Sequence, residues 1–596
     1  MKKTLVLLFA VLSLSFLAAM ADGIPTSQMA PVTLSQAVDI LDSTTMPYLP
    51  SQKEYMTKEH LRERVKKAYD EGIRKLYFRA TGGVAYHPGS KLRKMYTGIT
   101  PFHMIGAYTF AKYDILDEYI KAAHELGMEL YYWEPVFDTC GGYHWPKGSA
   151  WHDKFGEWPF RDESIPDELH WEHRFAKRPV QELERPVRKI TLKLYNVPKV
   201  KLDQLVLMTA PRNADFKVYE KPYTVTVNPV DGPAPYKSEM VIDGLELENP
   251  VVKLYCKDYS MQVGVVPDTK GAISAEYDDG TPVDMFINGE ILLFGDVAPE
   301  LVRDGPGGFS FNWGGQCYNN PVSFIIRFGD FTRYAIGTPE YAYKQNRDRI
   351  RDYVAELYEL HPDLDGVAFS IRTHTLPAGG GPTKVGAPIT YGFCDPVVHE
   401  YIRRYGVNPR EEKFDVNLFQ KLHGESFTQM LGEVAEVVHA HGGKLECMAP
   451  MAGAGNIAHG SMYDWWGTAN IDNFFDIRTW AQKGYVDNVI MIGTRYHQDT
   501  WDKPWKDNVR SFADHLKGTK TRLSLHVLVG GDPKHICTLL PQILQEAEID
   551  EIEAYEEWEM IRLGHYGTYR KAVESSGRRI AGVDTPPLYP KQDVKK

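Results

Sequence analysis

The sequence alternates amphipathic helical segments with short apolar segments, and this alternation is the feature that most limits how the chain can fold. Residues 57–72 have apolar positions at helical spacing, begin on the capping residue Thr57 and stop at a glycine. The segment 73–81 that follows has the aromatic and apolar content of a strand. Residues 111–127 and 128–135 repeat the helix and then the strand. This alternation is typical of a parallel sheet covered by helices.

The alternation breaks off in the middle of the chain. From about residue 186 to residue 300, short strand-like runs are separated by Pro, Gly, Asn and Asp, and helical periodicity is absent. This pattern is typical of an all-β module, and a sandwich is the expected form. We therefore expect an inserted β-sandwich domain at 186–300, flanked by barrel segments at 50–185 and 301–575, with a C-terminal tail at 576–596.

The strand segments outside the insertion set the fold class. Two precede the insertion and six follow it, with helical segments between them, and eight parallel strands with intervening helices predict a (β/α)8 TIM barrel. An open doubly wound sheet is the alternative, but no G-x-G-x-x-G opens the first βα turn. The expected strands are 73–81, 128–135, 307–315, 365–375, 444–450, 487–498, 522–531 and 551–560.

The N-terminus has the pattern of an export signal. Two lysines precede an apolar run that ends at the small-residue site Ala19-Met20-Ala21. We predict a signal peptide at residues 1–21, cleavage after Ala21, and a secreted or periplasmic protein. No later segment is long and apolar enough to predict a membrane span.

Composition excludes several classes of function. The net charge of -11 gives no basic surface for nucleic acid. The six cysteines form no close C-x-x-C pair, which argues against a zinc site. No H-E-x-x-H, phosphate-binding glycine loop or G-x-S-x-G is present, so we expect no metal and no cofactor. The 12 Trp and 35 Tyr fit either a large core or the stacking of aromatic rings on sugars.

One strand ends in basic residues. Within 365–375, bulky apolar residues alternate with Ala368 and Ser370, and the face of these two small residues continues to Arg372 and His374. In a barrel the small residues would fill the lumen. Arg372 and His374 would then emerge at the C-terminal mouth, where barrel enzymes hold their active sites.

The same alternation in other strands predicts a shared pocket at this mouth. It places Arg495 and His497 on the face of Met491, and His526 on the face of Ser524. Arginines at a mouth bind carboxylate, sulfate or phosphate, or are neutralised by catalytic carboxylates, and the sequence leaves both alternatives open. The candidate substrate-binding residues are Arg79, Trp133, Asn312, Arg372, His374, Arg495, His497 and His526.

Hydrolysis of a glycosidic bond usually needs two carboxyl groups, an acid and a base or nucleophile. The candidates at strand ends are Glu134, Glu446 and the pair Glu556 and Glu557, and for each the alternative is a surface or salt-bridging carboxylate. Alternation places Glu446 on the face of Met448 and Glu556 on the face of Ala554. The histidines could instead bind a metal ion, but no local spacing of ligands supports this.

Residues 361–374 (HPDLDGVAFSIRTH) and 477–497 (IRTWAQKGYVDNVIMIGTRYH) resemble the family-10-like glycosyl hydrolases, a group of glycoside-hydrolase-like barrels. Residues 68–80 and 125–135 resemble the first two strands of that group. Asp365 and Asp487 match the motifs of the group but lie at the N-terminal starts of their strands, where we expect a structural role.

The resemblance covers about residues 57–180 and 300–575, and it implies a secreted carbohydrate-active enzyme. The sequence departs from the large clan of retaining barrels, in which strand four ends in Asn-Glu and strand seven carries the nucleophile. Here these strands end in SIRTH and LHVLVGG, without a carboxylate.

We therefore expect a secreted glycoside hydrolase that acts on a poly- or oligosaccharide, with uronate- or sulfate-bearing glycans among the candidates. Glu446 and Glu556 are the expected acid/base and nucleophile in unassigned order, with Glu134 in reserve. A glycan-binding protein on a degenerate barrel is one alternative. A polysaccharide lyase that uses His or Tyr as base and Arg to neutralise a carboxylate is another. The inserted module would be a carbohydrate-binding domain or a brace.

Overall fold

The fold is known from a computed structural model that describes part of the chain. The described residues are 29–39, 56–79, 91–92, 109, 112–137, 167–172, 174, 183, 185–194, 205–211, 217–231, 237–249, 251–256, 273–283, 323–327, 334–371, 391–450, 474–492, 503–528, 533–555, 557, 560 and 566–583.

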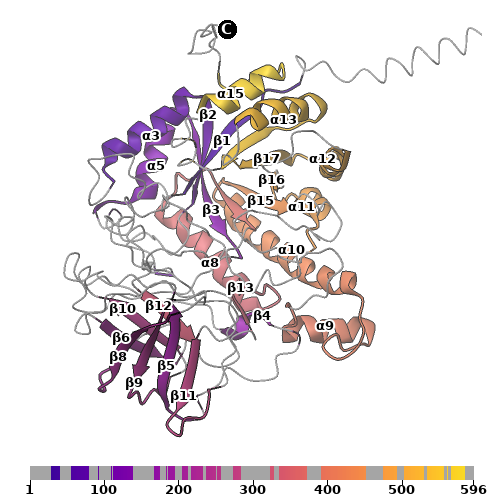
Figure 1. The fold of residues 1–596 in the computed structure, drawn as a ribbon. Helices are drawn as coiled ribbons and strands as arrows, with labels where there is room; N and C mark the ends of the chain where they lie inside the picture. Colours follow the sequence, from indigo (N-terminus) through magenta and orange to yellow (C-terminus); the bar gives the residue numbers. More distant parts are fainter. Residues whose placement is uncertain are drawn as a thin grey trace, which may run out of the picture.

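Eight parallel strands close into a barrel, which confirms the predicted fold class (Figure 1). Neighbours along the chain pair in parallel, and β1 pairs with both β18 and β2 to close the ring. The strands are β1 (Thr33–Asp39), β2 (Ile73–Arg79), β3 (Glu129–Pro135), β14 (Gly366–Ser370), β15 (Lys444–Pro450), β16 (Asn488–Ile492), β17 (Arg522–Leu528) and β18 (Glu551–Tyr555).

A helix follows each barrel strand along the chain, and the helices surround the barrel in Figure 1. They are α3 (Lys58–Asp70), α5 (Ile115–His124), α8 (Lys344–Leu360), α10 (Val416–Ala440), α11 (Ile477–Lys483), α12 (Lys503–Leu516), α13 (Pro533–Glu546) and α15 (Tyr566–Ser575), and α9 (Asp395–Tyr405) precedes α10. Within the described ranges, no helix has the length and hydrophobicity to cross a membrane.

The expected strand numbering is wrong in one place. In the closed barrel β3 pairs directly with β14, so no strand lies between them, and the expected strand 307–315 lies outside the described residues. The barrel is completed instead by β1. Its sequence TLSQAVD is largely polar, so the sequence pattern did not predict a strand there. The strand at Glu129–Pro135 is therefore the third of the barrel, and the insertion follows it.

The predicted helix signals are present. The Thr57 side chain accepts a hydrogen bond from the His60 backbone N–H at 3.3 Å, as expected of a cap worth about 1 kcal/mol. Gly72 and Gly127 follow α3 and α5 with φ of 96° and 70°, a left-handed backbone that favours glycine.

Three aspartates tie neighbouring strands together at their N-terminal ends. Each precedes a barrel strand and accepts, through Oδ2, the backbone N–H of the second residue of the previous barrel strand. The pairs are Asp365 with Leu130 at 2.7 Å, Asp487 with Leu445 at 2.9 Å, and Asp550 with Leu523 at 2.9 Å. Asp365 and Asp487 also contact His124 and His439. This geometry agrees with the structural role expected for the first two.

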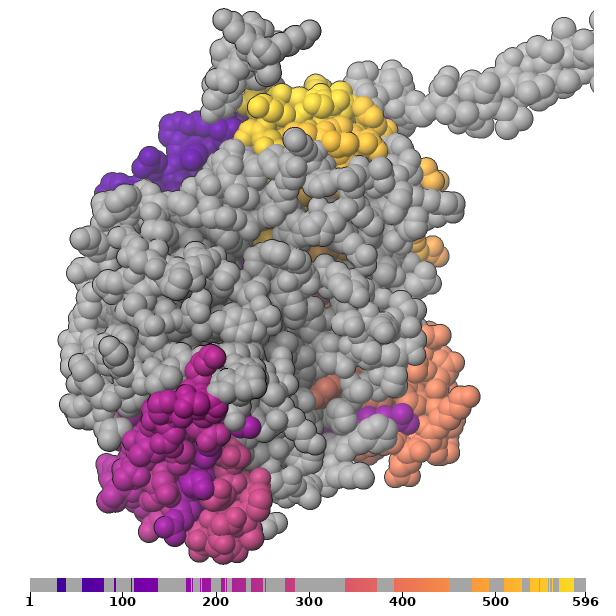
Figure 2. Space-filling view, viewed as in Figure 1, coloured from indigo at the N-terminus to yellow at the C-terminus, as the bar shows by residue number. Residues whose placement is uncertain are grey.

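The insertion between β3 and α8 forms two antiparallel four-stranded sheets with a core of their own. Figures 1 and 2 show its strands gathered in a lobe at the lower left. One sheet has the order β12-β10-β6-β7 and the other β11-β5-β9-β8. The strands are β5 (Val187–Leu194), β6 (Leu205–Ala210), β7 (Lys217–Val218), β8 (Thr224–Pro229), β9 (Ser238–Asp243), β10 (Val251–Cys256), β11 (Ile273–Tyr277) and β12 (Ser323–Arg327).

Strand β12 lies beyond the residue 300 at which the insertion was expected to end, and the domain limits stay a prediction. The short helix η2 (Asp167–Leu169) leads into β4 (His170–Glu172), which pairs with β13 (Tyr334–Pro339) where the chain returns to the barrel.

Candidate active site in the barrel lumen

Hydrogen bonds across the barrel identify the side chains that face the lumen. Tyr77 of β2 reaches Glu446 of β15 and Glu551 of β18, and Asn488 of β16 reaches Glu446. Because side chains alternate along a strand, these contacts fix the luminal face of each strand. The luminal residues fall into two groups at different heights.

The lower group, here called the floor cluster, consists of Lys75, Tyr77, Glu446 and Glu551. Lys75 is 1% exposed, and its Nζ lies 2.6 Å from Glu446 Oε1 and 3.1 Å from Glu551 Oε2. The ammonium group also lies 4.1 Å from the centre of the Tyr131 ring. A buried charge needs such partners, because removing it from water costs several kcal/mol.

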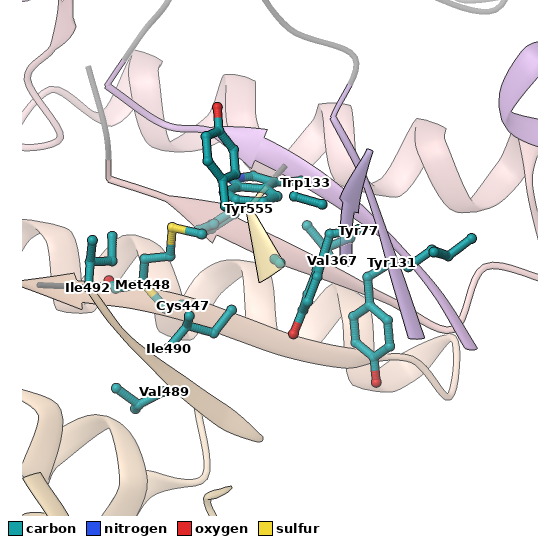
Figure 3. Packing of buried hydrophobic residues seen from close by; sticks show 14 of the residues in the cluster. Tyr77, Tyr131, Trp133, Val367, Cys447, Met448, Val489, Ile490, Ile492 and Tyr555 are labelled. Carbon is teal, nitrogen blue, oxygen red and sulfur yellow. Dashed lines mark hydrogen bonds between the residues drawn. The ribbon is translucent and has the colours of Figure 1, made fainter. Parts of the chain in front are cut away.

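The floor cluster requires a proton on one of its carboxyl groups. Tyr77 Oη lies 2.6 Å from Glu446 Oε2 and 2.6 Å from Glu551 Oε1, yet a phenol has a single proton to donate. The second contact is a hydrogen bond only if a protonated carboxyl donates to the phenol oxygen. Figure 3 shows the Tyr77 hydroxyl in the packed interior, far from the Tyr555 hydroxyl.

Glu446 is the carboxyl group that carries this proton. Burial raises the pKa of Glu446, and the charge of Lys75 only partly offsets this effect. Burial acts in the same direction on Glu551, but the charges of Lys75 and Arg522 outweigh it and lower the pKa of that carboxyl. Glu551 is therefore the anion that pairs with Lys75.

Gly366 makes room for the ring of Tyr131, which contacts Lys75 of the floor cluster. A Cβ atom added to Gly366 would lie 2.3 Å from Cε1 of Tyr131 and 2.4 Å from the Lys444 carbonyl oxygen. Gly366 is the glycine of the Asp-Gly-Val motif, so this motif has a packing reason.

The upper group, here called the upper lumen cluster, consists of Arg79, Trp133, His526, Glu553 and Tyr555. They come from β2, β3, β17 and β18, and in β2 and β18 they lie C-terminal to the residues of the floor cluster. The rings of Trp133, His526 and Tyr555 are in mutual contact, with centroid separations of 5.0 to 6.1 Å. Figure 3 shows Trp133 beside Tyr555.

The cluster contains a buried histidine and carboxylate pair. His526 Nδ1 is hydrogen-bonded to Glu553 Oε2, and neither residue is exposed. Arg79 Nη1 donates to Tyr555 Oη at 2.8 Å, and these two residues are each 7% exposed. Arg79 and Tyr555 therefore lie nearest the mouth, with the His526 and Glu553 pair beneath them.

The structure brings together three of the predicted site residues, Arg79, Trp133 and His526. It separates Glu446 from them, since its carboxyl group is engaged in the floor cluster. Glu134 follows the luminal Trp133, so it lies on the helix-facing side of β3 with Tyr132, whose hydroxyl contacts that of Tyr353 in α8. Outside the described residues lie Asn312, Arg372, His374, Arg495, His497 and Glu556.

The predicted face of one strand is wrong. Asn488 Nδ2 donates to Glu446 and to Ser524 within the lumen, so Ile490 and Ile492 are luminal and Met491 is not. The prediction took Met491 as luminal because it shares a face with Arg495 and His497. In β17, by contrast, Ser524 and His526 share the luminal face as predicted.

Sequence reasoning missed Lys75, Glu551, Glu553 and Tyr555. The signal was present in β18, whose sequence EIEAY places both glutamates and the tyrosine on one face. Glu551 and Glu553 lie within a strand, whereas the predicted carboxylates were all expected at strand ends. Glu557 is buried, and its Oε1 lies 3.5 Å from Arg64 Nε.

In the part of the chain that the structure describes, no group of three His, Cys, Asp or Glu side chains is arranged to hold a metal ion. The cation in the floor cluster is the Lys75 ammonium group itself.

No protein-family model and no curated protein match this sequence. Several solved structures are similar to the chain. The glycoside hydrolase domain of PgaB (BpsB) from Bordetella bronchiseptica is 10% identical, with 91% of this chain and 99% of that chain covered and a TM-score of 0.37. A β-galactosidase from the psychrophilic Marinomonas ef1 is 9% identical, with 88% and 54% covered and a TM-score of 0.35.

A trehalose-6-phosphate hydrolase from Bacillus licheniformis is 8% identical, with 92% of this chain and 72% of that chain covered and a TM-score of 0.33. At these identities and TM-scores the likeness carries no argument about substrate or mechanism. The resemblance to family-10-like glycosyl hydrolases stays an expectation.

Proposed function

We propose that this chain is an exported glycoside hydrolase that acts on a poly- or oligosaccharide at the C-terminal mouth of its barrel. The observation that carries the proposal is the buried His526 and Glu553 pair beneath Trp133, Tyr555 and Arg79. A proton-transfer pair beside aromatic rings can supply acid–base catalysis and a surface on which a sugar ring stacks.

Each residue of the pair has a role. Glu553 accepts the Nδ1–H of His526, which fixes the tautomer and leaves Nε2 as the atom that gives or takes a proton. During hydrolysis the bond between the anomeric carbon and the glycosidic oxygen breaks, and that oxygen gains a proton. The anomeric carbon bonds to the oxygen of a water molecule, which gives up a proton. His526 would transfer one of these protons, and the rings of Trp133 and Tyr555 would pack against the sugar.

The other predicted carboxylates have different roles in this proposal. Glu556 lies outside the described residues and stays the predicted second carboxyl group of the reaction, although its predicted face is that of Ala554 and not that of the luminal Tyr555. Glu446 fits a structural role better, because it is buried in the floor cluster with Lys75 and Tyr77. Arg79 supports an anionic substrate, and Arg372 and Arg495 are the other arginines predicted to bind that anion.

The test is to incubate the mature protein with neutral, uronate-containing and sulfated glycans and to analyse the products by mass spectrometry. Hydrolysis predicts products heavier by one water for each bond cleaved. His526→Gln and Glu553→Gln should each abolish these products. Full activity in both variants would overturn the assignment of the pair.

A polysaccharide lyase is the second candidate, and the contact between Arg79 and Tyr555 favours it. A guanidinium that neutralises a uronate, next to a phenol and an imidazole that can act as bases, is the arrangement for β-elimination. The products would lack the added water and would absorb ultraviolet light. Saturable binding of a glycan without any product would instead indicate a degenerate barrel.

A further inference from the structure

We propose that the upper lumen cluster contains a binding position for one hydroxyl group, formed by Trp133 Nε1 and Glu553 Oε1 beside the ring of His526. The inference rests on the proposed function only for the source of that hydroxyl, which is either a sugar or a water molecule. It deepens the function by adding a contact for a specific chemical group.

The first observation is a buried donor. Trp133 is 1% exposed, and its indole N–H has no hydrogen-bond partner among the described residues. Leaving a buried donor without a partner costs about 1–3 kcal/mol, and buried polar groups are bonded in most structures. In the outer core, by contrast, Trp480 donates its indole N–H to Thr428 Oγ1 at 2.8 Å.

The second observation is a buried acceptor in the same cluster. Glu553 Oε2 bonds to His526, whereas Glu553 Oε1 has no partner among the residues that the structure describes. The carboxylate is fully buried, so water at the surface does not reach this oxygen.

The two atoms belong to the same part of the lumen, because both residues contact His526. The rings of Trp133 and His526 meet edge to face at 6.1 Å, and Glu553 bonds to Nδ1 of that ring. The ring of Tyr555 packs against both, with centroid separations of 5.7 Å to Trp133 and 5.0 Å to His526.

A donor next to an acceptor selects the chemistry of the group between them. A hydroxyl can accept from the indole N–H and donate to the carboxylate at the same time. A ligand carboxylate would be repelled by Glu553, and an ammonium group could not accept from Trp133. A neutral hydroxyl is therefore the group that fits, and any anion of the substrate would bind elsewhere at the mouth.

The test follows the indole N–H of Trp133 by NMR in the full mature protein labelled at its indole nitrogens. Trp133→Phe removes one indole signal and so assigns it, while an aromatic ring remains at that position. The protein is then titrated with the methyl glycosides of glucose, galactose, mannose, N-acetylglucosamine and glucuronic acid. Trp480→Phe is the matched control, since it removes an indole N–H from the outer core.

A sugar hydroxyl predicts that at least one glycoside shifts the Trp133 signal, and that Trp133→Phe weakens its binding about fivefold while Trp480→Phe does not. A water hydroxyl predicts no such shift but a direct magnetisation transfer between the Trp133 indole proton and a bound water. The inference is overturned if the Trp133 signal shows neither effect. Because the readout needs no turnover, a chain that binds at Trp133 but hydrolyses no glycan would refute only the proposed function.

Discussion

At the scale of single residues, the contacts of the Tyr77 hydroxyl group show that the two carboxyl groups of the floor cluster differ in charge. Tyr77 lies 2.6 Å from two carboxyl groups and can donate to only one of them, so one of the two holds a proton. Burial raises the pKa of Glu446, whereas the charges of Lys75 and Arg522 lower that of Glu551, so we assign the proton to Glu446 and the negative charge to Glu551. A neutral carboxyl tolerates replacement by an amide better than an anion that balances a buried ammonium does.

We predict that Glu446→Gln lowers the free energy of unfolding by about 1 kcal/mol and that Glu551→Gln lowers it by about 3–5 kcal/mol, since the second change leaves Lys75 buried without its counter-charge. Urea denaturation of the two variants measures the difference. An equal loss in both variants would contradict the assigned proton.

The same assignment predicts a dependence of stability on pH. Burial raises the pKa of Glu446 in the folded state, so its contribution is complete below its ordinary pKa in the unfolded chain. The contribution is lost as pH rises through the raised pKa. As pH rises from the ordinary carboxyl pKa through the raised pKa of Glu446, the wild type should therefore lose stability more steeply than Glu446→Gln. Unfolding of both proteins at a series of pH values measures this difference. Parallel curves for the two proteins would show that Glu446 is ionised.

At the scale of elements, the barrel strands are joined by a repeated contact at the end away from the mouth. Asp365, Asp487 and Asp550 each accept a backbone N–H from a neighbouring strand. Asp487→Ala should leave the Leu445 N–H without its acceptor and lower the free energy of unfolding by about 1–3 kcal/mol. Because the contact is remote from the upper lumen cluster, turnover of the folded variant should be unchanged. A loss of turnover without a loss of stability would contradict the structural role.

A second prediction for the elements concerns the packing of β14 on β3. Gly366→Ala would place a methyl group 2.3 Å from the Tyr131 ring and 2.4 Å from the Lys444 carbonyl, so the strands would have to separate. We expect a loss of about 3 kcal/mol, measured by thermal unfolding. Tyr131→Ala in the same chain should recover only part of it, because the carbonyl contact remains. A stability equal to that of wild type would contradict the described packing.

At the scale of the whole molecule, the alternation of helix and strand was enough to predict the barrel and its insertion. It did not predict β1, because Thr33, Ser35 and Gln36 hide the strand pattern. The upper lumen cluster was predicted in part, through Arg79, Trp133 and His526. The floor cluster was not, because a single sequence does not show that Lys75 meets Glu551 at a separation of 476 residues.

The central claim is that the His526 and Glu553 pair, and not Glu446, supplies the proton-transfer chemistry. The most direct test is kcat/KM of Glu553→Gln and Glu446→Gln on the glycan that the wild type cleaves. The account predicts a loss of about 100-fold or more for Glu553→Gln, the scale of a lost acid–base group, and near wild-type turnover for folded Glu446→Gln. The reverse order would contradict it and return the catalytic role to the floor of the barrel.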